Sequence, residues 1–476
     1  MTLTPGPITA LSAAVREGRL SATALVTSSI ERLSRANPVL NVLAESAFEG
    51  ALEQAASIDR GARPTGRLAG VPALVKDLED WRGHRTRKGS AALRDAPLAV
   101  SSGVVPQRLI DAGAIIVGKS TLPEFAIEGY TANLLTGVTR NPWNTDYSPG
   151  GSSGGSAAAL GAGLVGVATA TDGGGSVRIP ASLCGLVGLK PTNGMIGRWP
   201  APDWIDYSTD GPFATSSDDL ALLMDVMVGP IAGDPTSPPH GTAWPLAPSD
   251  ERPWHVIAAD RTSPLGDLPA DVRAAFHESA GAFADLVGAQ LDWREPEGFF
   301  DGGDPDLDWF TVTTAEHVAS LGRSWVLEHM DEFHGATQEY LTTGLDVSID
   351  DYLAARRRRF LYVRTLDEML GGHGVLLTPT VACTGWLADG RLSADAAVHG
   401  LPPEVYSTAL QNVTGHPALT LPFGVLATGL PFGLQVTAPR YQDWRLLDLA
   451  GQFERAFPWP RSAPGYDPLS SVIEGP

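Results

Sequence analysis

Two glycine- and serine-rich segments carry the residues whose types and spacing suit chemistry. The first is Gly150-Gly-Ser-Ser-Gly-Gly-Ser156 and the second is Thr171-Asp-Gly-Gly-Gly-Ser176. A run of glycines can turn successive backbone N–H groups into one concavity, and such a concavity stabilises a developing oxyanion. The serine that ends the second run would lie inside it and act as a nucleophile. The expected oxyanion hole comprises the N–H groups of Gly173, Gly174, Gly175 and Ser176.

The proposed nucleophile needs a base, because a serine hydroxyl is a weak nucleophile at its own pKa. Neither segment contains a histidine. Lysine can serve where burial disfavours its charged form. Lys76 directly follows the apolar run Val71-Pro-Ala-Leu-Val75, which would carry it into the interior. We therefore expect Lys76 to be the base.

The order of these motifs resembles the amidase signature family. Further matching segments are Gly118–Ala126, Thr139–Trp143, Thr171–Ala181, Gly185–Thr192, Asn412–Pro417 and Gly429–Gln435. The resemblance covers about residues 65 to 230 and 370 to 457. It implies a catalytic trio of Lys76, Ser152 and Ser176, a cis peptide bond before Ser152, and no cofactor.

The implied mechanism proceeds through an acyl-enzyme. Ser176 Oγ attacks the amide carbonyl, and Ser152 relays the proton to neutral Lys76. The same relay returns a proton to the departing amine, because an unprotonated amine anion is a very poor leaving group. Water then hydrolyses the acyl-serine by the same route.

Three residues are expected to support the two turns. Gly151 leaves room for the turn that carries the relay serine. Asp172 and Arg178 are expected to pair and brace the glycine run, because charge-assisted hydrogen bonds are strong. Ser153 and Ser156 are interpreted as hydrogen-bonding residues of the loop.

Another motif points to a different class of protein. Gly113-Ala-Ile-Ile-Val-Gly-Lys-Ser120 matches the nucleotide-binding pattern GxxxxGK[ST]. A phosphate-binding loop needs a turn between its two glycines, whereas β-branched residues favour extended backbone. The segment is therefore predicted to be a strand ending at Gly118, and a nucleotide-binding protein is the last-ranked alternative.

The substrate class is narrowed by two departures from the family pattern. Val405 occupies the position where glutamine-using members carry an aspartate that holds the substrate's amino group. A buried valine cannot neutralise an ammonium group, so a glutamine-amidotransferase A-type subunit ranks below a stand-alone amidase. Gly173 replaces a usually larger residue and is expected to widen the pocket beside the oxyanion hole.

Tryptophan is the other indication of substrate preference. Twelve are present, and several could line an apolar cleft for an aryl or hydrophobic acyl group or could equally belong to the core. Carbamates and esters present the same carbonyl to the same machinery and stay open as alternatives. The candidate cleft residues are Trp199, Trp204, Trp309, Trp325 and Trp386.

Composition limits the other partners. Asp and Glu total 54 against 34 Lys and Arg, a formal charge of -20, which disfavours binding to nucleic acid and to anionic membranes.

No apolar run approaches the ~20 residues of a membrane helix, and no secretory signal is recognised, so a cytoplasmic location is expected. Two cysteines and unpaired histidine spacings predict neither disulfides nor a metal site. The expected partner is a small-molecule amide, and a homodimer stays open.

The elements that must position these residues follow from hydrophobic spacing. Helical periodicity from Thr9 to Ala62 predicts a helical N-terminal arm. Short apolar runs between helical stretches predict an α/β fold with a mixed central β-sheet covered by helices on both faces. One domain spans residues 1–476: the arm (1–64), the core with the catalytic residues (65–230), a variable substrate-side insertion (231–370) and a return to the core sheet (371–476).

Overall fold

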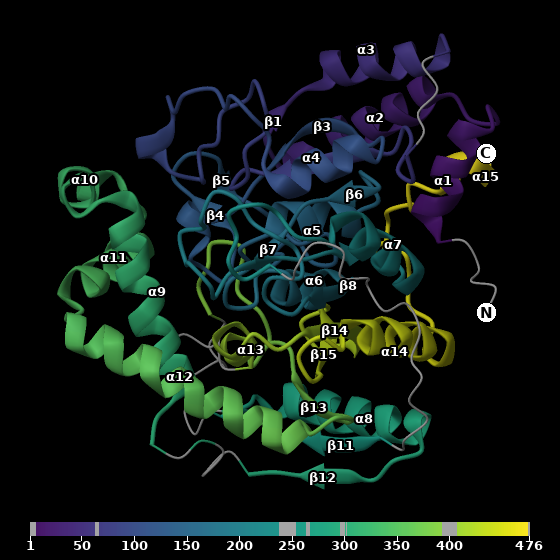
Figure 1. Cartoon of the computed structure of the whole chain (residues 1–476). Coiled ribbons are helices and arrows are strands. Elements are labelled where there is room, and N and C mark those ends of the chain that lie inside the picture. The colour runs from purple at the N-terminus through teal and green to yellow at the C-terminus, as the bar shows by residue number, and fades with distance from the viewer. Residues whose placement is uncertain are drawn as a thin grey trace.

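The computed structural model describes residues 6–61, 66–237, 254–262, 267–295, 300, 302–392 and 407–474. Its α/β class, its mixed sheets and their covering helices are as the sequence predicts (Figure 1). Val405 lies outside the described residues.

The N-terminal arm is mostly helical, as expected, but it also contributes strand β1 to a four-stranded sheet of order β1-β3-β2-β6. Strand β1 runs antiparallel to β3, whereas β2 is parallel to both β3 and β6. Helix α2 starts where Ser21 accepts a hydrogen bond from the Ala24 N–H at 3.2 Å. The elements are α1 (Pro7–Arg16), α2 (Ala22–Leu40), β1 (Leu43–Ser46), α3 (Phe48–Asp59), β2 (Pro72–Lys76), α4 (Val104–Asp111), β3 (Ile115–Ser120) and β6 (Val167–Ala168).

A seven-stranded sheet of order β10-β8-β14-β15-β13-β11-β12 forms the second half of the core. It is antiparallel from β10 to β13 and parallel from β13 to β12. The predicted α/β class with mixed sheets thus holds, but the strands of the described residues are divided among four sheets: the two described above and the two-stranded sheets β4-β5 and β7-β9. The strands are β8 (Val187–Lys190), β10 (Phe213–Ala214), β11 (His255–Ala258), β12 (Leu291–Trp293), β13 (Gly374–Pro379), β14 (Ala418–Val425) and β15 (Pro431–Thr437).

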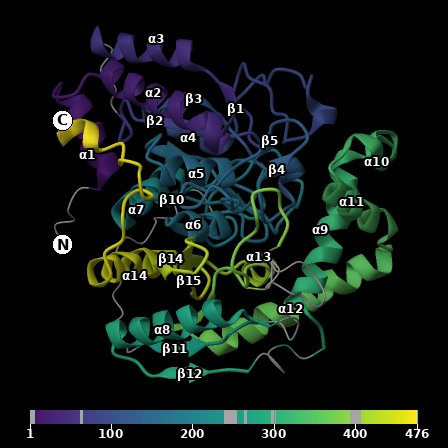
Figure 2. The ribbon, with the colours of Figure 1, turned by 180° about the vertical axis from the view of Figure 1, so that it is seen from behind.

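Helices cover both faces of this sheet. Figures 1 and 2 show α12 on one face and α8 on the other, and both contact β13. Every residue of β13 and β15 is buried, which accounts for their predominantly apolar sequences. The covering helices are α6 (Arg178–Cys184), α7 (Ser217–Met227), α8 (Ala270–Val287), α12 (Ile349–Leu370), α13 (Ala409–Thr414) and α14 (Asp443–Ala456).

The nucleotide-loop alternative is not supported by the backbone. Residues of the GxxxxGK[ST] match form β3, so extended backbone occupies the place of the loop. The strand continues past the predicted end at Gly118 to Ser120. Lys119 Nζ lies 2.7 Å from Asp77 Oδ1 in a buried ion pair, which fixes this lysine inside the protein.

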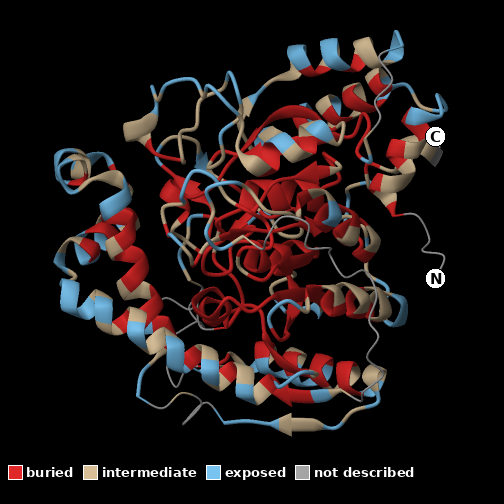
Figure 3. Cartoon of the chain, in the orientation of Figure 1, coloured by how far each residue is buried: buried red, intermediate tan, exposed pale blue. Residues whose placement is uncertain are grey.

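The segment between β10 and β13 contributes both to the sheet and to a group of helices beside it. Strands β11 and β12 form one end of the seven-stranded sheet. Three helices of the same segment pack together at the left of Figure 1: α9 (Pro305–Leu321), α10 (Arg323–His329) and α11 (Gly335–Asp346). Figure 3 shows that α9 is largely buried whereas the outer faces of α10 and α12 are exposed. Helix α9 therefore lies between the core and its neighbouring helices.

Short elements complete the path to the site. Buried α5 follows the first glycine- and serine-rich turn directly, and β7 precedes the second. Within the described residues, no helix is both long and apolar enough to span a bilayer. The short elements are η1 (Ala91–Leu93), η2 (Glu124–Ala126), β4 (Ala132–Asn133), β5 (Gly137–Val138), α5 (Gly154–Gly161), β7 (Thr171–Asp172), β9 (Thr209–Asp210), η3 (Met330–Glu332) and α15 (Ser471–Glu474).

Candidate active site

Lys76 lies at the end of β2, where the strand brings it into the interior. Its side chain is fully buried. Its Nζ is within hydrogen-bonding distance of three hydroxyl oxygens: Ser152 Oγ at 2.8 Å, Ser153 Oγ at 2.9 Å and Thr171 Oγ1 at 2.9 Å. Its backbone N–H donates to Thr169 Oγ1 at 2.8 Å. The lysine thus meets both glycine- and serine-rich turns.

The environment of Lys76 favours its neutral form. Burial lowers its pKa from the usual 10.5 to about 7, although the carboxylates of Glu79 and Asp172 act in the opposite direction. At neutral pH a large fraction of this amine is therefore unprotonated. Such an amine can accept a proton from a neighbouring hydroxyl.

The turn that carries Ser152 is tightly enclosed. The Gly151–Ser152 peptide bond is cis, as the family resemblance implies. A Cβ at Gly151 would lie 2.4 Å from Glu128 O and 2.7 Å from Tyr130 O, so only glycine fits there. Ser152 is 1% exposed and Ser176 is 9% exposed, and both line one cavity.

The turn that carries Ser176 is organised by Asp172. Asp172 Oδ1 accepts the Gly175 N–H at 2.9 Å, and Oδ2 accepts the Val177 N–H at 3.2 Å. This corrects the expectation for Gly175, because a carboxylate already engages its N–H. The candidate oxyanion donors that remain are the N–H groups of Gly173, Gly174 and Ser176.

The expected pair between Asp172 and Arg178 is present and wholly buried. Nη2 lies 2.8 Å from Oδ1 and Nε lies 3.0 Å from Oδ2. Burial alone would raise the pKa of Asp172, but the ion pair with Arg178 outweighs it and holds this pKa at about 2. Arg178 Nη1 also donates to Gln411 at 3.0 Å and to Gln435 at 2.8 Å. The pair therefore joins the oxyanion turn to β15 and α13.

The expectation that Gly173 widens the pocket is wrong, because an indole ring occupies the vacated volume. A Cβ at Gly173 would lie 2.2 Å from Trp204 Cε3. Trp309 Nε1 donates to Gly173 O at 2.7 Å, and the same ring packs over Gly174. Two tryptophans therefore lie directly against the oxyanion turn.

The candidate cleft tryptophans separate into four environments. Trp199 and Trp204 line the cavity, and Trp309 lies behind the turn. Trp325 packs against Phe125 and belongs to the cluster of helices α9–α12. Trp386 is 1% exposed and is a core residue.

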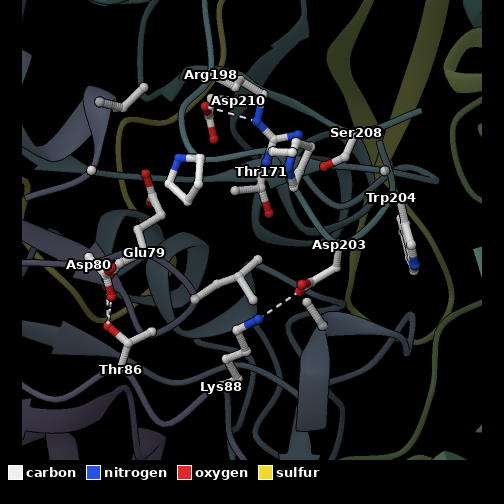
Figure 4. Close-up of a pocket in the computed structure, with 18 of the residues that line it drawn as sticks. Glu79, Asp80, Thr86, Lys88, Thr171, Arg198, Asp203, Trp204, Ser208 and Asp210 are labelled. Atoms are coloured by element: carbon white, nitrogen blue, oxygen red, sulfur yellow. Dashed lines mark hydrogen bonds and ion pairs between the residues drawn. The ribbon is translucent and has the colours of Figure 1, made fainter. Parts of the chain in front are cut away.

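The cavity that opens onto both serines measures about 340 Å³. Ser152, Thr171, Gly173 and Ser176 line its catalytic end. Two ion pairs also line the cavity, as Figure 4 shows: Lys88 Nζ lies 2.8 Å from Asp203 Oδ2, and Arg198 Nε lies 3.5 Å from Asp210 Oδ2.

Comparison with known proteins gives the family. A family model described as Amidase matches residues 24–297 and 314–447. This chain belongs to the amidase signature family. Members of this family are hydrolases that act on amide C–N bonds.

The alignments with individual relatives cover nearly the whole chain. The A subunit of a glutamyl-tRNA(Gln) amidotransferase from Synechococcus sp. (strain CC9605) is 32% identical over 93% of this chain and 94% of its own length. An acylamidase from Rhodococcus erythropolis is 31% identical over 96% of both chains. A crystal structure of a bacterial aryl acylamidase superposes with a TM-score of 0.85 at 26% identity, covering 99% of this chain and 100% of that one.

Several cavity residues of this amidase were not found from the sequence. Thr171 lies within the second motif, so its contact with Lys76 could have been anticipated. Glu79 comes three positions after Lys76, and Thr169 donates to its carboxylate while accepting the Lys76 N–H. Burial raises the pKa of Glu79 to about 8, and neighbouring Asp210 acts in the same direction.

His317 of this amidase comes from α9 and reaches the cavity from the segment 231–370. No local motif marks it. Among the described residues, no group of three or more His, Cys, Asp and Glu side chains is arranged to hold a metal ion. The two cysteines of the chain, Cys184 and Cys383, are both buried.

Proposed function

We propose that this protein hydrolyses the C–N bond of carboxylic amides through an acyl–Ser176 intermediate. The observation that supports this best is the position of Lys76 Nζ, buried and 2.8 Å from Ser152 Oγ. A lysine whose pKa is about 7 can exchange protons near neutral pH. Ser176 lines the same cavity as Ser152, at the end of a turn rich in backbone donors.

The chain's own residues account for each step. Ser176 Oγ attacks the amide carbonyl, while its proton passes through Ser152 to neutral Lys76. The oxyanion is held by the N–H groups of Gly173, Gly174 and Ser176. Lys76 then returns the proton through Ser152 to the nitrogen, and the C–N bond breaks. Water repeats the sequence on the acyl-serine and releases the acid.

The substrate is a small amide with an aryl or hydrophobic group. Phe125, Val104, Val105 and Trp204 give the cavity an apolar wall, which supports such a group. The structural similarity to an aryl acylamidase supports the same class. Carbamates and esters carry the same reacting carbonyl and are the nearest alternatives.

A glutamine-using amidotransferase subunit is the second candidate, because such a protein is 32% identical to this chain. Val405 stands against it, since it replaces the aspartate that holds the glutamine amino group. Free glutamine is therefore included among the substrates to be tested.

The experiment is an activity panel of aryl amides, primary aliphatic amides, carbamates, esters and glutamine. Wild-type protein and Ser176→Ala are assayed in parallel. We expect turnover of aryl amides by the wild type only, with glutamine the poorest substrate. Full activity of Ser176→Ala would overturn the mechanism, and a preference for glutamine would favour the second candidate.

A further inference from the structure

His317 is a buried polar residue of the cavity wall that no catalytic step uses. It is 1% exposed, and it lines the cavity. Within the part of the chain that the structure describes, neither Nδ1 nor Nε2 has a hydrogen-bond partner. A buried polar group without a partner is destabilising, so such groups usually have one. Because His317 borders the cavity, an occupant of the cavity can supply this partner.

Aromatic rings fix the orientation of His317. Its ring meets Phe125, Trp204 and Tyr340 edge to face, with centroid separations of 5.7, 6.0 and 5.9 Å. Burial lowers the pKa of His317 to about 4, so the imidazole is neutral at neutral pH. A neutral imidazole offers one N–H donor and one acceptor nitrogen.

Helix α9 holds His317 in a fixed position relative to the nucleophile. Trp309, on the same helix, donates to Gly173 O at 2.7 Å in the turn that precedes Ser176. Ser320 Oγ donates to Asp203 Oδ1 at 2.6 Å, so the helix is also tied to the cavity rim. A ligand that contacts His317 would therefore be held in a fixed position relative to Ser176.

Two aromatic side chains line the cavity beside His317. Phe125 and Trp204 line the cavity together with His317, and we call these three residues the aromatic subsite. We propose that the aromatic subsite binds a planar aromatic ring of the substrate that carries a hydrogen-bonding atom, as in hydroxyaryl or nitrogen-heteroaryl amides, and that His317 bonds this atom. The proposal rests on the proposed function, since it specifies the substrate of that site.

The test separates ligand recognition from turnover. Binding of benzamide, 3-hydroxybenzamide and nicotinamide to Ser176→Ala is measured by titration calorimetry, with and without His317→Phe. Phenylalanine keeps the ring but removes both nitrogens. We expect the two polar ligands to lose about tenfold in affinity, the equivalent of one hydrogen bond, and benzamide to change by less than about twofold.

Two controls exclude a purely structural role. His329→Phe changes a histidine of the same helical group that stacks on Trp325 outside the cavity, and it should leave all three affinities unchanged. His317→Phe should also raise the melting temperature, because it removes a buried group that has no partner in the described residues.

Each outcome bears on one proposal. Equal losses for all three ligands, no loss, or no binding of any of them would overturn the aromatic subsite. Wild-type protein is assayed on the same amides in parallel. Ligand discrimination that depends on His317, without any Ser176-dependent hydrolysis, would overturn the proposed function and leave the subsite standing as a binding site.

Discussion

Trp204 packs directly over Gly173, so that a Cβ at Gly173 would lie 2.2 Å from Trp204 Cε3. The indole ring is rigid, so it cannot make room for a methyl group at that distance unless the whole ring moves. We expect Gly173→Ala to displace either the ring or the turn and to lower kcat/KM on an aryl amide by about 10- to 100-fold. Trp204→Leu in the same chain should restore part of this loss, because it removes the clashing ring.

Gly281→Ala is the matched control for that substitution. A Cβ at Gly281, inside α8, would meet no atom of the described residues within 4 Å. The activity of the Gly281→Ala variant should therefore equal that of the wild type. Equal kinetics for Gly173→Ala and Gly281→Ala would show that the indole does not constrain the oxyanion turn.

Ser152 and Ser153 form a matched pair, because both hydroxyls lie within 2.9 Å of Lys76 Nζ. Of the two, only Ser152 lines the cavity that contains Ser176. We expect Ser152→Ala to reduce kcat by about 10²–10⁴-fold, the usual contribution of a proton-transfer group, and Ser153→Ala to cost less than about tenfold. Steady-state rates on one amide decide this, and similar losses for both variants would contradict a specific relay through Ser152.

The pH dependence of kcat/KM should follow Lys76. Burial lowers its pKa to about 7, and the base must be neutral to accept a proton. We therefore expect kcat/KM to rise as the pH increases through about 7 and then to level off. Lys76→Met should lose about 10³-fold or more at every pH.

Glu79 titrates in the same range, so its variant serves as the control. The ionised carboxylate stabilises the charged lysine, but a pKa of about 8 keeps Glu79 mostly neutral where Lys76 titrates, so Glu79→Gln should move the rising limb only slightly to lower pH without abolishing it. Loss of the limb in Glu79→Gln would assign the titration to Glu79 instead of Lys76.

The buried pair of Asp172 and Arg178 should dominate local stability. Arg178→Met leaves the Asp172 charge buried without its partner, which costs about 3–5 kcal/mol of unfolding free energy. Arg364→Met, in a solvent-exposed pair with Glu368, is the control and should cause no measurable change. Chemical denaturation measures both. Equal stability of the two variants would contradict the importance of the buried pair.

The site residues that could be predicted from the sequence are those that lie close together within one motif. Asp172 and Arg178 lie within one motif, and their opposite charges were the basis for the expected pair, which the structure contains. The approach of Lys76 to Ser152 was implied by the family resemblance, and the apolar run before Lys76 explains its burial. These residues form the part of the site that local sequence patterns are able to predict.

The remaining cavity residues depend on tertiary packing. Trp204 comes from a loop, while Trp309 and His317 come from a helix far along the chain, and no local pattern brings these three residues to the site. For the same reason the space beside Gly173 was expected to be open although an indole fills it. The division of the strands into separate sheets likewise depends on pairings between distant segments, such as β1 with β3.

The most direct test of the central claim is labelling with a fluorophosphonate probe, followed by peptide mapping with mass spectrometry. We expect a single adduct on Ser176, slower labelling of Ser152→Ala and Lys76→Met, and no adduct at this peptide in Ser176→Ala. Labelling of another residue at the wild-type rate, or labelling unaffected by Lys76→Met, would contradict it.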